Sequence, residues 1–215
     1  MSLARWVRQA ILVAAIAAFG FVSACGSVDG YPEPKIAPGT VESTFLPIDD
    51  VSALVGTTLM SVDSVSSPPA PLSADPAGCA VAVGPATQVV YTRGWQRFGS
   101  VSYQDPTLEH VVTQVLGGYP NQEQATSAFG SLVDGLAGCA KAVHTNQDHS
   151  SVTWNYTVGA KSADSVAWTA TQNAGDEWTC FHQGRRKGTA LLEVSVCQAG
   201  DGGQAAKTIM DRFAA

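Results

Sequence analysis

The residues of this chain most able to do chemistry are its five cysteines, one near the start and four in the body of the chain. The four are Cys79, Cys139, Cys180 and Cys197, and no two of them form a CxxC pair. Because a zinc site needs reduced thiols at closer spacing, this pattern favours two disulfides in an exported protein. Four cysteines allow three connectivities, of which we favour Cys79–Cys139 and Cys180–Cys197.

The second pair depends on where the chain turns between Cys180 and Cys197. The intervening segment, FHQGRRKGTALLEVSV, is a candidate hairpin. If its turn centres on Gly188-Thr189, the two cysteines lie directly opposite each other, close enough for a disulfide. If the turn centres on Arg186, the register misses by several residues. The sequence leaves both positions of the turn open.

The fifth cysteine, Cys25, ends the hydrophobic stretch that opens the chain. Arg5 and Arg8 precede the uncharged run Ala10–Val22, which is too short to span a bilayer comfortably and is typical of a secretory signal peptide. The last four residues, Val22-Ser23-Ala24-Cys25, resemble the lipobox of bacterial lipoproteins, in which the cysteine carries a lipid after cleavage. We therefore predict that Cys25 is a lipidation site.

This interpretation divides the chain into three parts. Residues 1–24 are the predicted signal peptide, and residues 25–45 are a lipidated N-terminus with a Pro-rich tether. Residues 46–215 form one domain, long enough for a sizeable core. The predicted location is the extracytoplasmic face of the cell membrane, with the lipid anchor as the contact to the bilayer.

Composition excludes some classes of protein. The formal net charge is -6, and the chain shows none of the basic character of a nucleic-acid-binding protein. Only 14% of residues are charged, and 21 Gly and 11 Pro indicate a turn-rich, β-rich globule.

Few other residues suggest catalysis or metal binding. His144, Asp148 and His149 could be imagined as metal ligands, but their segment HTNQDHSS is typical of a solvated polar loop. No serine lies in a GxSxG elbow. The paired carboxylates Asp49-Asp50 and Asp176-Glu177 fit the first turn of a helix and the tip of a hairpin. We expect no catalytic residue, no metal site and no cofactor.

The elements that must position any site follow from periodicity. Helices are expected at Ile48–Val55, at Asn121–Gly138 with Asn121 as cap, and from about Gly203. Strands are expected at Gln88–Trp95, Gly99–Tyr103, Glu109–Leu116, Ser151–Val158, Ser165–Gln172 and Ala190–Cys197. Apolar and hydroxyl residues alternate in the last three strands. The predicted fold class is α+β, an antiparallel sheet with one apolar face, one hydroxyl-rich face and flanking helices.

Candidate ligand-binding residues come from this alternation. The hydroxyl-rich face includes Thr153, Asn155 and Thr169, whose short polar groups can hydrogen-bond a ligand. The expected face also includes Thr157, Thr171, Glu193 and Ser195. Aromatic candidates for apolar walls, which can equally be core residues, are Trp95, Trp154 and Trp168. Arg185 belongs to the basic cluster GRRKG, which is either a solvated hairpin tip or a contact for anionic lipids or cell-wall polymer.

The order of these features resembles a known family. A short helix ending in LVG leads to a GC, then to VYTRGW, and a helix that begins YPNQEQATSAF runs to a cysteine. Alternating strands and a second cysteine pair precede the last helix. From about Phe45 to Ala215 the chain resembles the extracellular sensor domain of the mycobacterial receptor kinase PknH and the lipoproteins that carry this domain without a kinase.

The resemblance implies an antiparallel sheet with flanking helices, two intramolecular disulfides and a cleft for an unknown ligand. The chain departs from the family at Gly135–Gly138, where members often place a tryptophan before the second cysteine, so the ligand can differ. It also lacks the kinase motifs GxGxxGxV, HRD and DFG. Two functions follow: a non-catalytic, sensor-like domain that binds an envelope lipid, glycan or protein, or a structural lipoprotein that presents a surface.

Overall fold

The structure is a computed structural model that describes residues 41–92, 94–146, 148–173 and 178–215. The predicted signal peptide, Cys25 and most of the predicted tether lie outside these residues. The described elements are, in order, η1 (Glu42–Thr44), α1 (Ile48–Val55), β1 (Met60–Val65), η2 (Ala77–Cys79), α2 (Ala80–Val83), β2 (Arg97–Gln104), β3 (His110–Gly118), α3 (Gln122–Ala137), β4 (Lys141–Thr145), β5 (Ser151–Lys161), β6 (Ser165–Gln172), β7 (Trp178–Lys187), β8 (Ala190–Ala199) and α4 (Gly203–Phe213).

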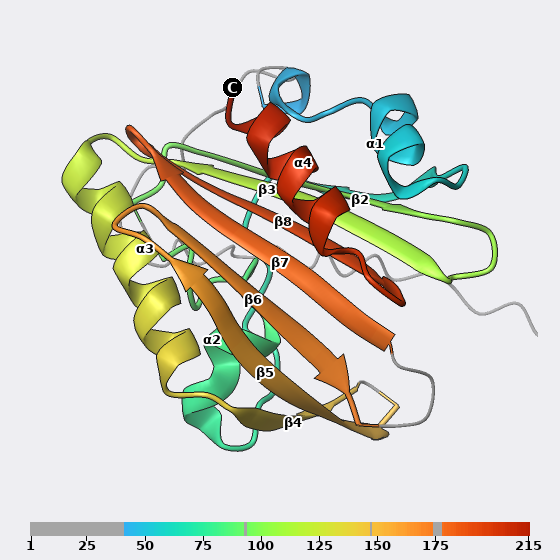
Figure 1. Cartoon of the computed structure of the whole chain (residues 1–215). Coiled ribbons are helices and arrows are strands. Elements are labelled where there is room, and N and C mark those ends of the chain that lie inside the picture. The colour runs from blue at the N-terminus through green and yellow to red at the C-terminus, as the bar shows by residue number, and fades with distance from the viewer. Residues whose placement is uncertain (1–40, 93, 147, 174–177) are drawn as a thin grey trace, which may run out of the picture. The chain divides into compact units, whose positions relative to one another are not determined.

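The strands join in one eight-stranded sheet whose neighbouring pairs are all antiparallel. Their order is β1-β2-β3-β8-β7-β6-β5-β4, so β8 returns to pair with β3 in the middle of the sheet. Figure 1 shows α4 on one side of the sheet, with α3 and α2 on the other. The predicted α+β fold class is confirmed. Within the described ranges, no helix is long and apolar enough to cross a membrane.

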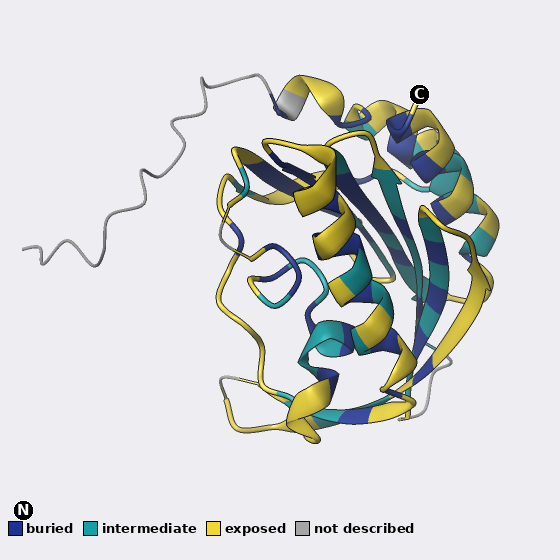
Figure 2. Cartoon of the chain, turned by 90° about the vertical axis from the view of Figure 1, so that its left-hand side faces the viewer, coloured by how far each residue is buried: buried dark blue, intermediate teal, exposed yellow. Residues whose placement is uncertain are grey.

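Each face of the sheet carries its own hydrophobic core (Figure 2). The α3 face, named for its helix, carries Trp168 and Leu191, which pack with α2 and α3. The α4 face carries Leu192 and Val194, which pack with α1 and α4. The expectation of a single apolar face across all strands is therefore wrong.

The two cores arise because the strands differ in what covers them. Strand β8 is central and buries both of its alternating sets, odd-numbered residues toward α3 and even-numbered residues toward α4. Strands β5 and β6 are covered on the α3 face alone, where they bury Tyr156, Val166, Trp168 and Ala170. Their hydroxyl residues therefore lie on the α4 face, whereas Glu193 and Ser195 lie on the α3 face. The sequence analysis places Glu193 and Ser195 on the hydroxyl-rich face, and this placement is wrong.

Helix α3 begins as its sequence predicts. The Asn121 side chain accepts a hydrogen bond from the Gln124 backbone N–H at 2.9 Å, which satisfies a free donor of the first turn. The helix packs closely on the sheet at Gly184 of β7, where a Cβ would lie 2.9 Å from Leu132. A side chain at this position would press the helix away from the sheet. The buried residues of α3 are Ala125, Ala128, Phe129, Leu132 and Leu136.

Both favoured disulfides are present. Cys79–Cys139 joins η2 to the residue that follows α3, and Cys180–Cys197 joins β7 to β8. The first closes a long loop and fastens the segment before β2 to the end of α3. The second links two strands that are already paired.

The β7–β8 turn lies at Gly188-Thr189, because Lys187 pairs with Ala190. This register sets the two cysteines of the hairpin directly opposite each other. Gly188 has a φ of +58°, a left-handed conformation that glycine adopts at little cost. The alternative turn at Arg186 is excluded.

Two parts of the fold differ from the sequence expectations. Gln88–Trp95 is expected as a strand, but the described residues 88–92 form turns and a bend. Just before them, the Thr87 hydroxyl donates to the Gly84 carbonyl at 2.7 Å. Strands β1 and β4 are not expected. Strand β4 includes only the first two residues of the segment expected as a polar loop, His144 and Thr145. Asp75 and Val143 exchange two backbone hydrogen bonds of 2.9 Å on the edge of this strand.

The ordered domain begins before residue 46. Val41 and Phe45, which the sequence analysis places in the tether, are only 2% and 7% exposed. Val41 fills the space beside Gly99, where a Cβ would lie 2.4 Å from the valine side chain. The Phe45 ring centroid lies 5.5 Å from that of Phe213 in α4. Residues 41–47, named the leading segment, therefore belong to the core of the α4 face.

Candidate functional site

Helix α4 covers only part of its side of the sheet, and β4, β5 and β6 carry no helix there (Figure 1). Strand register places a set of mostly short polar side chains on this uncovered area. They are named the open polar face and comprise Lys141, Thr145, Thr153, Asn155, Thr157, Ser165, Thr169 and Thr171.

Several polar side chains form a row across the strands. Lys141 pairs with Asn155, Asn155 with Thr171, and Thr171 with Thr179 of β7. The Thr171 and Thr179 hydroxyl oxygens are 3.2 Å apart, and the Asn155 amide donates to the Asn173 side chain at 3.3 Å. Neighbouring strands lie about 4.8 Å apart, so the row offers hydrogen-bonding groups at short, regular intervals.

The row ends in a shallow, open pocket of about 340 Å³ beside the start of α4. Its lining residues are Thr171, Thr179, Phe181, Gly200 and Asp201. The pocket therefore combines two hydroxyls, one aromatic ring and one carboxylate. Its volume is at the low end for a small-molecule site, about 300–1,000 Å³.

The turn before α4 fixes the positions of two pocket residues, Asp201 and Phe181. Asp201 Oδ1 accepts a hydrogen bond from the Gly203 N–H at 2.8 Å, and the Asp201 carbonyl accepts one from the Gln198 amide at 3.1 Å. A Cβ at Gly202 would lie 3.0 Å from the Phe181 ring, so glycine lets the chain pass close over that ring. Among the described residues, no Lys or Arg forms an ion pair with Asp201.

Three predicted ligand-binding residues lie on the open polar face. Asn155 is the direct neighbour of the pocket residue Thr171, and Thr169 pairs with Phe181. Thr153 lies two residues from Asn155 along β5, on the same face. The structure therefore brings these three to one surface.

The predicted tryptophans lie on the other side of the sheet. Trp168 is buried in the core of the α3 face, and Trp95 and Trp154 pack against that core. The Trp95 ring centroid lies 6.1 Å from that of Phe98. Because the sheet separates them from the pocket, these tryptophans cannot form its walls.

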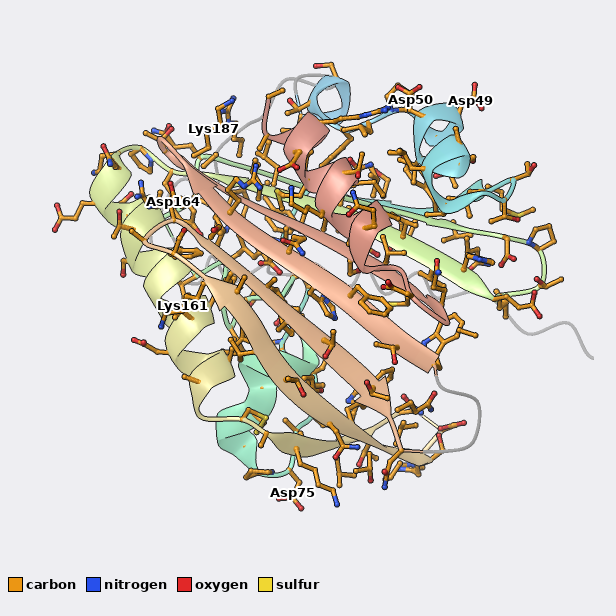
Figure 3. The ribbon with its side chains drawn as sticks, in the orientation of Figure 1. Asp49, Asp50, Asp75, Lys161, Asp164 and Lys187 are labelled. Atoms are coloured by element: carbon orange, nitrogen blue, oxygen red, sulfur yellow. A yellow bond between two sulfur atoms is a disulfide. The ribbon has the colours of Figure 1, made fainter. Side chains whose placement is uncertain are left out.

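Arg185 lies on the α4 face but away from the pocket, four residues along β7 from Phe181, or about 13 Å. Its guanidinium donates to Asp211 of α4 at 2.8 Å, and the Lys187 ammonium donates to the carbonyls of the last two residues. Hydrogen bonds from Lys207 and Arg185 lower the pKa of Asp211. Figure 3 shows Lys187 at the turn end of the hairpin. Arg185 and Lys187 thus fasten the end of α4 and the last two residues to β7.

Two of the three residues considered as metal ligands have side-chain partners within the described chain. His144 Nδ1 lies 2.9 Å from the Ser73 carbonyl oxygen, and Asp148 accepts hydrogen bonds from the backbone and hydroxyl of Ser150. In the part of the chain that the structure describes, no three His, Cys, Asp or Glu side chains converge on a possible metal position.

The α3 face brings together Glu193, Ser195 and His182, which the sequence analysis does not group. Ser195 pairs with His182 across β8 and β7, yet within the described ranges no hydrogen bond joins their side chains. The His182 ring stacks on Trp168 with centroids 4.6 Å apart, and burial lowers its pKa to about 3. A general base needs contact with the nucleophile and a pKa near ambient pH. This set therefore lacks the arrangement of a hydrolase.

Glu193 is also unusual because it is buried beside Tyr91 and Tyr119, with 4% of its surface exposed. Burial raises its pKa to about 7. Glu193 Oε1 and both phenol oxygens have no hydrogen-bond partner in the described chain. The carboxyl group is therefore largely protonated below neutral pH.

Sequence reasoning missed four of the pocket residues. The alternation in β7 places Thr179 and Phe181 on the same side as Arg185, and this signal was available. The run Gly200-Asp201-Gly202-Gly203 before the last helix also marks Asp201 as a residue at a helix start. The side-by-side placement of β6, β7 and this turn is a long-range property that no local pattern shows.

A match to a known protein family covers all of the described residues. Residues 36–215 match the family model described as PknH-like extracellular domain. The chain belongs to this family. Membership supports an extracytoplasmic, non-catalytic domain and confirms the resemblance seen in the sequence.

Two solved structures resemble the chain. The crystal structure of the extracellular domain of PknH from Mycobacterium tuberculosis has a TM-score of 0.73 at 19% identity, over 80% of this chain and 92% of that chain. A putative uncharacterized protein from Mycobacterium smegmatis has a TM-score of 0.35 at 9% identity, over 79% of this chain and 97% of that one. No curated protein matches the chain. At 19% identity, the similarity to PknH shows the fold alone.

Proposed function

We propose that this chain is a lipid-anchored extracytoplasmic domain that binds an envelope-derived ligand on its open polar face and does not transform it. The observation that carries the proposal is the pocket of about 340 Å³ at the end of the polar row. A concave site with a few convergent polar groups is the usual form of a small-molecule site. This shallow pocket supplies one apolar wall from its aromatic ring and the polar groups of its hydroxyls and carboxylate.

The chemistry of the described side chains favours binding over catalysis. Ser195 and His182 are the nearest approach to a nucleophile and base, and they lack both the hydrogen bond and the basicity that this role needs. The pocket contains no histidine or cysteine. A ligand would therefore be held and released unchanged.

The lipid anchor is proposed from the lipobox pattern at Cys25. Cys25→Ala should leave an unprocessed precursor or a released soluble protein, which membrane fractionation and mass spectrometry would detect. Inhibition of the lipoprotein signal peptidase should have the same effect. Unchanged membrane retention of the Cys25→Ala protein, with its signal peptide removed, would refute the anchor.

The binding proposal is tested by NMR titration of the full chain with separate envelope fractions of lipids, glycolipids and peptidoglycan fragments. One fraction should shift the signals of Thr171, Thr179 and Asn155, and Thr171→Val should weaken its binding. Thr126→Val, an exposed change on α3, is the control and should bind as the unmodified chain does. If no fraction shifts these signals, a lipoprotein that only presents a surface remains.

A further inference from the structure

Asp201 restricts which ligands fit the pocket. One oxygen, Oδ1, is bonded to the Gly203 N–H at 2.8 Å, whereas Oδ2 has no partner among the described residues. A carboxylate without a cation repels phosphate, sulfate and carboxylate groups, so anionic lipid head groups fit poorly. The same free oxygen is a strong acceptor for hydroxyl donors.

Phe181 supplies the apolar wall. Gly202 and Gly203 cover part of its ring, where a Cβ would lie 3.0 Å and 3.4 Å from ring atoms. Another part lines the pocket, and its neighbour across β6 is the small residue Thr169. An aromatic face carries negative charge density and attracts C–H groups, so it suits the apolar face of a sugar ring.

The polar row supplies the third component. The Thr171 and Thr179 hydroxyls, 3.2 Å apart, can each donate and accept, and Asn155 extends the row along β5. An acyl chain laid over this row would cut these groups off from water without replacing their hydrogen bonds, which is unfavourable. A ligand with many uncharged hydroxyls would replace those bonds.

From these three components we infer that the pocket and the adjoining part of the row, from Asn155 to Thr179, bind an uncharged saccharide. The sugar ring packs on Phe181, its hydroxyls donate to Asp201 Oδ2, and its neighbouring oxygens meet the Thr171–Thr179 pair. This inference rests on the proposed binding function and names the class of ligand.

The test uses saturation-transfer NMR and titration calorimetry on the full chain. The probes are glucose, galactose, arabinose, N-acetylglucosamine and short oligomers of each, with tetramethylammonium and inorganic phosphate as charged probes. We expect saturable binding of at least one saccharide, with saturation transferred mainly to its C–H protons. Phosphate should not bind.

Two variants change the pocket side chains while the domain is expected to stay folded. Asp201→Asn keeps an acceptor for the Gly203 N–H but removes the charge, and it should weaken binding on the order of tenfold or more. Phe181→Leu keeps an apolar contact with α4 but removes the ring, and it should also weaken binding. Asp164→Asn is the matched control, an exposed aspartate next to the other end of β6 that accepts from Ser162 at 2.8 Å (Figure 3). It should bind normally, and circular dichroism should show all three variants folded.

The outcomes distinguish this inference from the broader proposal. If no saccharide binds but a lipid fraction shifts Thr171 and Asn155, the ligand class is wrong and the binding function stands. If neither a saccharide nor a lipid fraction shifts the signals of these residues, the ligand class and the binding function are both wrong. Unchanged saccharide affinity in Asp201→Asn and Phe181→Leu, or tighter binding of tetramethylammonium than of any sugar, would also overturn the inference.

Discussion

Gln114, in the middle of β3, holds both backbone groups of Leu46, although 68 residues separate the two in sequence. The Leu46 N–H donates to Gln114 Oε1 at 3.0 Å, and the Gln114 amide donates to the Leu46 carbonyl at 3.2 Å. The Tyr103 hydroxyl donates to the same carbonyl at 3.3 Å. The Gln114 side chain is fully buried, so it replaces a backbone partner inside the core.

Gln114→Leu should therefore lower the free energy of unfolding by about 1–3 kcal/mol, because the Leu46 N–H is left buried without a partner. Urea denaturation measures the change. Gln204→Leu, an exposed substitution on α4, is the control and should change stability by less than about 0.5 kcal/mol. Equal effects of the two changes would contradict a structural role for the Gln114 amide.

The buried carboxyl of Glu193 should make stability fall as pH rises from about 4.5 to 7. Burial raises its pKa from 4.5 to about 7, so in this interval the unfolded chain ionises while the folded chain keeps its proton. The stabilising contribution is complete below pH 4.5 and lost above pH 7, a difference of about 3 kcal/mol. Glu193→Gln should be more stable than the unmodified chain at pH 8 and nearly equal to it at pH 4. Glu123→Gln, at an exposed position on α3, is the control in the same denaturation series.

The buried His182 should make stability fall as pH decreases, which is opposite to the effect of Glu193. Burial lowers its pKa from 6.5 to about 3, so its contribution is complete above pH 6.5 and lost as pH falls toward 3. Between about pH 4.5 and 6.5 the contributions of Glu193 and His182 oppose each other. The Glu193→Gln variant, in which only His182 titrates, should therefore lose stability as pH falls. The His182→Gln variant, in which only Glu193 titrates, should lose stability as pH rises toward neutral. If both variants keep the pH profile of the unmodified chain, these two groups do not set it.

Leu108 occupies a backbone conformation that leucine rarely adopts, with a φ of 61° in the β2–β3 turn and a side chain 58% exposed. The Asp105 carboxylate holds this turn by accepting from the N–H groups of Glu109 and His110 at 2.9 and 3.1 Å. Leu108→Gly should raise the free energy of unfolding by about 1 kcal/mol, because glycine takes this conformation without a clash. Thermal and urea denaturation should show no such gain for Leu72→Gly, an exposed loop control. A less stable Leu108→Gly would mean that the side chain contributes more than its strain costs.

Elements with local stabilising contacts were predictable from the sequence. Asn121 marks the start of α3 because its cap is formed within one turn. The hairpin between Cys180 and Cys197 was expected, but only the pairing of β7 with β8 places its turn at Gly188, whose φ is +58°. The segment around Tyr91 was not predictable, since its conformation depends on a distant contact. The Tyr91 ring covers Gly117 of β3, where a Cβ would lie 2.4 Å away.

The candidate site was predictable only where a local sequence pattern determines which face of the sheet a side chain occupies. Alternation in β5 and β6 places Asn155 and Thr169 on one face, and the structure keeps them together. Alternation cannot say which face of a central strand is polar when both are buried, and it therefore misplaces Ser195. The pocket residues Phe181 and Asp201 meet only because α4 folds back over β7.

The leading segment also determines how the domain would respond to a pull on the chain before it. Val41, Phe45 and Leu46 contact β2, α4 and β3, and a force on the tether acts on these contacts before it reaches the hydrogen bonds between strands. Side-chain packing and a few hydrogen bonds are weaker under load than a sheet in which every strand is paired. The leading segment should therefore detach first and lengthen the tether by about 3.5 Å for each residue released. The sheet, both disulfides and the pocket would stay intact, so under tension the domain would move away from the proposed lipid anchor and keep its open polar face.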